Sequence, residues 1–185
     1  ILREQRAEVS SDDLGLVVSA SHNPAEYNGV KVFARGGHKL ADADELAIES
    51  LLGATGPGGG AVEHSADVAG RYVEHVTQHF GSDLTGLRIA VDCANGAFST
   101  IAPGVFERLG AAVTTIGATP DGTNINAGCG ATDLDLLADT VRVRGLDFGV
   151  AFDGDGDRML AVDGAGNPID GDQIIAIITL SLGVD

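Results

Sequence analysis

Short apolar runs alternate with helix-like segments from residue 86 onward, and this alternation constrains the fold more than any other feature of the sequence. The apolar runs predict strands at residues 87–92, 112–116, 147–152 and 159–162. Helical periodicity predicts helices at residues 100–109 and 134–144, the second opened by Thr132 or Asp133. A β-α-β-α-β order is typical of a parallel-type α/β sheet, where ligands gather at the carboxyl ends of strands.

The sequence before residue 86 predicts strands at 14–18 and 30–33 and helices at 42–52 and 67–80. A glycine-rich stretch at residues 53–60 has no Lys-Ser or Lys-Thr after it, so we interpret it as a linker and exclude a P-loop. A last helix, predicted at residues 170–182, has the apolar density of a buried element.

The composition excludes several function classes. The 185-residue chain carries a formal charge of −16, which argues against a nucleic-acid-binding face and against an anionic membrane surface. Two cysteines, Cys93 and Cys129, are too few for a disulfide framework, so we expect both to be reduced. The sequence has neither a signal-peptide pattern nor an apolar run of spanning length, and we expect a cytoplasmic protein. Both ends of the chain are interpreted as cut from something larger.

Three carboxylates at alternate positions, Asp153, Asp155 and Asp157, follow the predicted strand at 147–152. Side chains two residues apart in extended backbone point the same way, and the intervening glycines let the chain curl so that the carboxylates converge. Converged anions repel one another at short range, and oxygen ligands suit Mg²⁺ or Ca²⁺. The run therefore predicts a site for a divalent cation.

Four other interpretations of this acidic run differ in the residues that they require. An EF-hand beginning at Asp153 would need Gly at position 158 and Glu at 164, where the chain has Arg158 and Gly164. A haloacid-dehalogenase-like phosphotransferase would use Asp153 as the phosphate acceptor and Asp155 as the acid/base, but that pattern has Thr or Val in place of Asp157. A non-catalytic metal-binding module and a simple acidic surface turn are further alternatives.

A second candidate is Ser21, in the run Ser-His-Asn-Pro after the first predicted strand. Pro24 disfavours helix at the preceding residue, which leaves the hydroxyl on an open loop. A turn at Asn28-Gly29 returns the chain, so Lys31 is expected near Ser21. A hydroxyl, the imidazole of His22 and an amine can serve phosphoryl transfer, although an ordinary turn serine is the alternative.

A pair of histidines and a long polar loop are two further features of the sequence. His75 and His79 have a spacing that can bind metal, but without a flanking glutamate motif a solvated helix face is the better interpretation. The polar loop at residues 117–132 is long enough to favour some role, whether contact with substrate, contact with a neighbouring domain or support of the structure.

Taken in order, the runs at 19–24, 27–31 and 153–158 resemble the α-D-phosphohexomutase superfamily. Further runs resemble the bacterial phosphoglucosamine mutase family, at residues 36–40, 92–97, 120–126 and 129–130. The resemblance implies truncated phosphohexomutase architecture, an α/β fold of three-layer α/β domains with mixed or parallel sheets. It divides the chain into the end of domain one at 1–68, domain two at 69–167 and the start of domain three at 168–185.

The resemblance also implies roles for the candidate residues. Ser21 would carry a phosphoryl group, and one Mg²⁺ per chain would be held by Asp153, Asp155, Asp157 and a phosphate oxygen on Ser21. The metal would offset the charge that a phosphoserine adds. For the remaining candidates, the family implies that Lys31 is an acid/base and that His22 is an active-site helper. It implies that Arg158 is a neighbour of the phosphoserine.

The implied enzyme is a phosphohexomutase of the isomerase class. It would interconvert glucosamine 6-phosphate and glucosamine 1-phosphate through glucosamine 1,6-bisphosphate or a similar sugar bisphosphate, on the way to peptidoglycan precursors. Sister enzymes acting on mannose or glucose phosphates are the nearest alternative. The expected partner is a phosphosugar, and an exposed apolar edge near residues 14–33 would favour a homodimer. The family's phosphate clamp is not in this chain, so we expect it to turn over poorly by itself.

Overall fold

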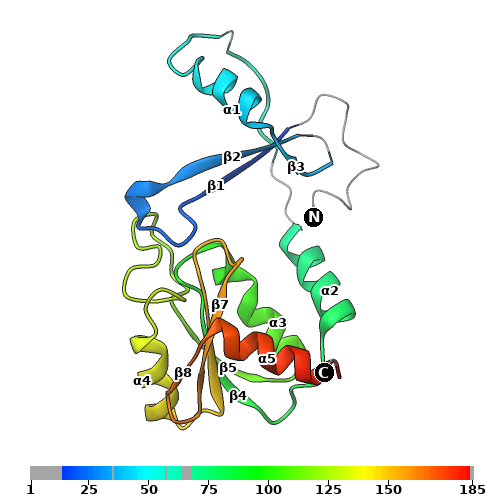
Figure 1. Ribbon diagram of the computed structural model, residues 1–185, viewed down its shortest axis with the longest axis vertical. Coiled ribbons are helices and arrows are strands. Elements are labelled where there is room, and N and C mark those ends of the chain that lie inside the picture. Colours follow the sequence, from blue (N-terminus) through cyan, green and yellow to red (C-terminus); the bar gives the residue numbers. More distant parts are fainter. Residues whose placement is uncertain (1–13, 35, 57, 64–67, 184–185) are drawn as a thin grey trace. The chain divides into compact units, whose positions relative to one another are not determined.

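The computed structural model describes residues 14–34, 36–56, 58–63 and 68–183. The chain divides into two compact units that interleave in sequence. One unit comprises residues 1–19 and 29–68, and the other comprises residues 20–28 and 69–185. Each unit contains its own β-sheet, with three strands in the first and five in the second (Figure 1).

The three-stranded unit is an antiparallel sheet followed by a short helix. Its strands are β1 (Gly15–Ser19), β2 (Gly29–Ala34) and β3 (His38–Lys39), in the order β1-β2-β3. Helix α1 (Asp42–Glu49) begins with three acidic residues, which complement the positive end of the helix dipole. None of the described residues of this unit is buried.

The five-stranded unit has a mixed sheet in the order β5-β4-β6-β7-β8. Its strands are β4 (Arg88–Asp92), β5 (Ala112–Ile116), β6 (Phe148–Phe152), β7 (Met159–Asp163) and β8 (Pro168–Ile169). Strand β4 is parallel to β5 and β6, whereas β7 is antiparallel to both β6 and β8. Parallel neighbours need a crossover, which helices α3 (Ala102–Arg108) and α4 (Asp135–Arg144) supply.

Alternate side chains of the central strands form two cores, one on each face of this sheet. On one face, Ile89, Val91, Val150 and Ala161 pack with Ala102 of α3. The opposite core pairs small and branched strand residues with the inner face of α4, and its buried members are Ala90, Leu137, Val141, Leu146, Ala151 and Val162. The unit is therefore three-layered, with helices on both faces (Figure 1).

The remaining elements of the five-stranded unit are two helices and two 3₁₀ turns. Helix α2 (Val68–Phe80) and the turn η2 (Ala97–Thr100) are joined by a ring contact between Tyr72 and Phe98 at 6.3 Å. The turn η1 (Ala25–Tyr27) follows Ser21. Helix α5 (Gly171–Ser181) begins with a capping box, because Asp170 and Gln173 each accept the other's backbone N–H.

The order and type of the predicted elements are confirmed, with several corrections. The sheet is mixed, one of the two arrangements that the family resemblance implied, because β7 returns as a hairpin after β6. Helix α1 ends at Glu49, three residues before the predicted end. The N-cap of α4 is Leu134; neither Thr132 nor Asp133 takes that place, although the Asp133 carboxylate accepts the N–H of Asp135. Strands β3 and β8 were not predicted, since two-residue strands give no periodicity.

The prediction of a buried last helix is wrong for the described residues. Ile174 packs against the first core, but α5 has no buried residue, and Ile175 is 63% exposed. The predicted helix start at Asp67 lies outside the described residues, as do residues 1–13 and 184–185 of the predicted domain segments. No helix in the described ranges combines the length and apolarity that a bilayer crossing requires.

Candidate functional site

The acidic run forms the turn of the β6–β7 hairpin, at the carboxyl end of β6. Asp153 is fully buried and Asp157 is exposed, yet the three carboxylates each offer an oxygen within 4.8 Å of the others. The base of the turn is closed by Arg158, whose N–H donates to Asp153 Oδ1 at 3.2 Å. Gly156 adopts a left-handed φ of 72°, which lets the turn curl inward.

The electrostatics of this turn favour a cation. Burial raises the pKa of Asp153, and the neighbouring carboxylates of Asp155 and Asp157 raise it further, against the lowering effect of the Arg158 N–H. Asp153 Oδ2 is buried and no hydrogen-bond partner reaches it from the described residues. Arg158 Nε lies 3.9 Å from Asp157 Oδ1, but both side chains are well exposed, so this pair relieves little of the charge. The arrangement could bind a metal ion through hard oxygen ligands.

The loop that carries Ser21 lies against this acidic turn within the five-stranded unit. Ser21 Oγ donates a hydrogen bond to Asp155 Oδ1 at 3.1 Å, across 134 residues of sequence. The same hydroxyl lies 3.4 Å from Nδ1 of the exposed His22. Ser21 has a φ of 52°, which is uncommon for a residue with a side chain and points to a loop whose conformation is held by its surroundings.

Close backbone contacts hold the serine loop and the acidic turn together. A Cβ at Gly154 would collide with the carbonyl oxygen of Ser21 and would lie 2.5 Å from Ile125 Cδ1. A Cβ at Gly96 would lie 2.7 Å from Gly154 Cα, and Gly154 O accepts the N–H of Ala97 at 2.9 Å. Glycine at 96 and 154 therefore allows three separate chain segments to meet at the site.

Two residues that support this region were not among the sequence-predicted site residues. Asp92, fully buried at the end of β4, accepts the N–H of Ala94 at 2.9 Å and the N–H of Gly130 at 2.8 Å. Burial raises the pKa of Asp92, and these two bonds partly oppose that effect. Asn126 donates its side-chain amide to the carbonyls of Ser21 and Asn23. For Asp92, its place at the carboxyl end of a predicted strand was a usable signal.

The predicted site residues are divided between the two units. Ser21, His22 and the three aspartates belong to the five-stranded unit, as does Arg158. Lys31 lies in β2 of the three-stranded unit, paired in register with Val17. Its expected proximity to Ser21 therefore remains a prediction.

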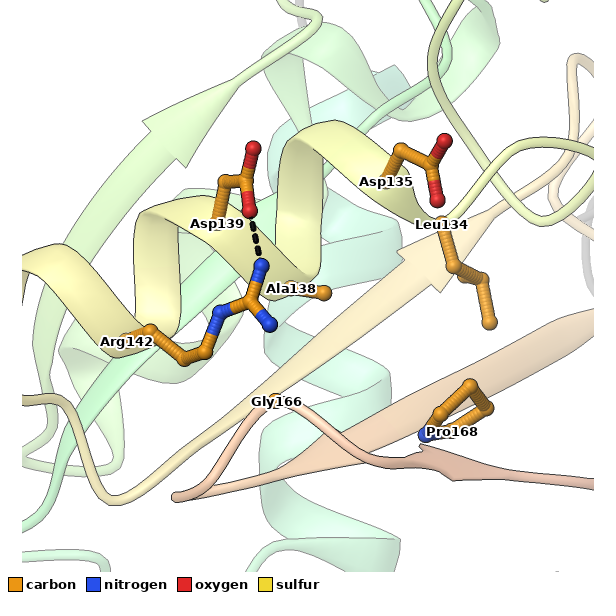
Figure 2. A pocket seen from close by; sticks show the side chains of 7 residues that line it. All are labelled: Leu134, Asp135, Ala138, Asp139, Arg142, Gly166 and Pro168. Atoms are coloured by element: carbon orange, nitrogen blue, oxygen red, sulfur yellow. Dashed lines mark hydrogen bonds and ion pairs between the residues drawn. The ribbon is translucent and has the colours of Figure 1, made fainter.

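Other candidates are less suited to chemistry. The side chain of His79 is exposed on α2 and its Nδ1 lies 2.9 Å from the carbonyl of His75, which fits a solvated helix face. The full burial of Asp153 disfavours its use as a phosphate acceptor in a haloacid-dehalogenase-like reaction. A pocket elsewhere in the unit lies between α4 and the β7–β8 turn, where Arg142 bonds Asp139 (Figure 2). None of its lining residues belongs to the serine loop or the acidic turn.

Comparisons with known proteins give a consistent result. Family models described as phosphoglucomutase/phosphomannomutase, alpha/beta/alpha domains I and II, match residues 8–56 and 70–166. Proteins named phosphoglucosamine mutase from Renibacterium salmoninarum and Thermobifida fusca are 51% and 50% identical, over 94% and 92% of this chain. The chain spans only 40% and 39% of those relatives.

A solved structure from Burkholderia thailandensis, described as a phosphoglucomutase/phosphomannomutase family protein, superposes with a TM-score of 0.71 at 29% identity. The match covers 92% of this chain and 38% of that one. Sequence and fold therefore agree on the same family, and this chain matches less than half the length of those relatives and of that solved structure.

Proposed function

Because the chain belongs to the phosphoglucomutase/phosphomannomutase family, we propose that it carries the phosphoserine and metal loops of a phosphoglucosamine mutase. Relatives with about 50% sequence identity to this chain carry that name, and the chain spans about two fifths of their length. The reaction proposed for the whole protein interconverts glucosamine 6-phosphate and glucosamine 1-phosphate. The observation that carries the proposal is the hydrogen bond between Ser21 Oγ and Asp155 Oδ1 beside three clustered carboxylates.

Ser21 is the proposed carrier of the phosphoryl group. Its hydroxyl lies on a loop whose backbone is fixed by close contact with Gly154. A nucleophile held in one conformation avoids the entropy cost of being oriented at each turnover. A phosphate on Ser21 Oγ would add nearly two negative charges beside the Asp155 carboxylate, a juxtaposition that needs a compensating cation.

Mg²⁺ is the proposed cation, held by Asp153, Asp155 and Asp157 together with a phosphate oxygen on Ser21. The fit rests on the chemistry of the donor set, since Asp153 Oδ2 is buried without a hydrogen-bond partner among the described residues and is an anionic oxygen suited to a hard ion. When bound, the ion would offset the charge of the phosphoserine and polarise its phosphorus. Arg158, whose backbone closes the acidic turn, would add positive charge near the same group.

A sugar hydroxyl oxygen attacks the phosphorus of phosphoserine 21, a P–O bond to the sugar forms, and the bond from phosphorus to Ser21 Oγ breaks with its electron pair going to Oγ. Lys31, as a neutral amine, takes the proton of the attacking sugar hydroxyl. A second proton, delivered by His22, whose Nδ1 lies 3.4 Å from Ser21 Oγ, leaves Ser21 as a hydroxyl. The sugar bisphosphate then turns over and returns its other phosphoryl group to Ser21 by the reverse of these steps. Glucosamine 1,6-bisphosphate is therefore both the proposed intermediate and an activator of unphosphorylated enzyme.

The test uses the native gene product that contains these residues. A coupled assay with glucosamine, glucose and mannose phosphates should give the highest kcat/KM with glucosamine 6-phosphate. Ser21→Ala should abolish turnover and remove a phosphate that intact mass detects before phosphatase treatment. Ser50→Ala removes an exposed hydroxyl at the C-cap of α1 and is the matched control. It should change neither the turnover nor the phosphate content.

Metal removal gives the second arm of this test. EDTA should stop turnover, Mg²⁺ should restore it, and Asp155→Asn should weaken Mg²⁺ binding in calorimetry. Preference for glucose or mannose phosphate would move the assignment to a sister mutase. Robust Mg²⁺ binding with neither turnover nor phosphate on Ser21 would replace the enzyme proposal with a metal-binding module.

A further inference from the structure

The side-chain amide of Asn126 connects the long polar loop after β5 to the serine loop. Asn126 Nδ2 donates to the carbonyl of Ser21 at 2.7 Å and to the carbonyl of Asn23 at 2.9 Å. The two acceptors flank His22 and lie 105 and 103 residues earlier in the sequence. One NH₂ group therefore holds the backbone on both sides of that residue.

The orientation of this amide is determined by its partners. Two carbonyl acceptors require two N–H donors, which an amide nitrogen supplies and a carboxylate cannot. The opposite atom, Asn126 Oδ1, is buried and has no hydrogen-bond partner among the described residues. An unsatisfied buried acceptor is destabilising, so the two hydrogen bonds from Asn126 Nδ2 to the serine loop are kept although Oδ1 of the same side chain has no partner there.

The backbone of Asn126 is itself held in place from the core. Its φ is 56°, in the left-handed region that asparagine tolerates better than most residues. Its N–H donates to the carbonyl of Ala94 at 2.8 Å, and the N–H of Ala94 donates to the buried Asp92. Hydrogen bonds made by Ala94 and Asn126 thus connect a buried carboxylate in β4 to the carbonyl of Ser21.

We propose that Asn126 is a positioning residue that fixes the carbonyl of Ser21 and thereby aims Ser21 Oγ at the acidic turn. Ser21 adopts a left-handed φ, and without an outside constraint it would relax toward the extended or helical regions. A change in that dihedral swings Cβ and Oγ away from Asp155. This inference rests on the proposed function, since it assigns Asn126 to the orientation of the phosphoryl-carrying hydroxyl.

Two variants separate the amide from the backbone it sits on. Asn126→Asp keeps the shape of the side chain but places a carboxylate against two carbonyls. Asn126→Gly keeps the left-handed backbone at no steric cost and removes the amide. Asn124→Asp is the matched control, because the Asn124 amide donates to Thr119 O within its own loop.

In the native gene product, we expect both Asn126 variants to lower kcat by about 10²-fold with KM little changed, since a misaimed nucleophile affects the chemical step. Asn124→Asp should keep the wild-type kcat. The inference is overturned if Asn126→Gly, folded by circular dichroism, retains the wild-type kcat, or if Asn124→Asp loses as much as Asn126→Asp.

A readout without catalysis distinguishes this inference from the proposed function. In ¹⁵N relaxation measurements on the native gene product, Ser21 and Asn23 should be ordered in the wild type and in Asn124→Asp, and should gain fast motion in both Asn126 variants. If the order of the serine loop depends on Asn126 but the protein has no mutase turnover, the proposed function is refuted and the positioning role of Asn126 is retained. An ordered serine loop in both Asn126 variants would refute the positioning role of Asn126 even if the enzyme is active.

Discussion

The two units of this protein differ in how far the hydrophobic side chains of their sheets are buried. Within the described residues, every buried hydrophobic side chain belongs to the five-stranded unit, including Ala20 of the serine loop. In the three-stranded unit the strands pair in full register, yet Leu16 and Val18 are each 67% exposed. Strand pairing alone can define a sheet, whereas a site with fixed geometry is built here on the unit whose sheet is covered on both faces.

This difference also bears on association. The predicted exposed apolar surface near residues 14–33 is found, since Leu14, Leu16, Val18 and Val30 are all at least 60% exposed. Exposed apolar strands are templates for pairing with another chain, so a homodimer remains a prediction that light scattering can check.

The largest effect should come from truncating the two-sided core. Leu137 is fully buried between α4 and the sheet, and its Cδ1 fills the space above Gly149. Leu137→Ala should lower the free energy of unfolding by about 2–5 kcal/mol because it leaves a cavity. Leu16→Ala, the same change on the three-stranded unit, should alter it by less than about 0.5 kcal/mol.

Urea titrations followed by far-ultraviolet circular dichroism give both free energies. Comparable losses from the two substitutions would mean that the three-stranded unit is packed as tightly as the five-stranded one. That result would remove the contrast on which the comparison depends.

The sequence predicted the ordered elements well because their signals are local. Apolar runs and helical periodicity located the central strands and the helices that cross between them to within a few residues. Exposure was harder to predict, as α5 shows, because burial depends on what packs against a helix and not on its own composition alone.

In the candidate site, too, features with a local sequence signal were predicted from that signal, and long-range contacts were not. The convergence of Asp153, Asp155 and Asp157 followed from their spacing, and the structure places their oxygens together. The contact between Ser21 and Asp155 was expected only through resemblance to a family. Asn126 closes a run that resembles the family, but nothing local predicted its contacts with the serine loop, because its amide donates to carbonyls more than a hundred residues away.

An intermediate effect should come from glycines where chain segments meet. Gly96→Ala would push a Cβ into the backbone of Gly154, which cannot move without disturbing the acidic turn, and should cost about 1–3 kcal/mol. It should also weaken Mg²⁺ binding measured by calorimetry. Gly29→Ala in β2 has nothing within 4 Å of the added carbon and is the matched control. An unchanged Mg²⁺ affinity in folded Gly96→Ala would show that the acidic turn does not depend on this contact.

The smallest effect is expected from surface charge, where the two units should behave alike. Arg142 pairs with Asp139 on α4 (Figure 2), and Lys39 lies 3.6 Å from Glu45 in the three-stranded unit. Arg142, Asp139 and Lys39 are exposed and Glu45 is partly exposed, so Asp139→Asn and Glu45→Gln should each change the free energy of unfolding by about 0–1 kcal/mol, with the change shrinking as salt is added. Thermal unfolding at low and high ionic strength measures both free-energy changes.

A much larger loss from Glu45→Gln would mean that ion pairing stabilises the three-stranded unit in the way that the core stabilises the five-stranded unit. Equal small losses would leave burial as the physical difference between them.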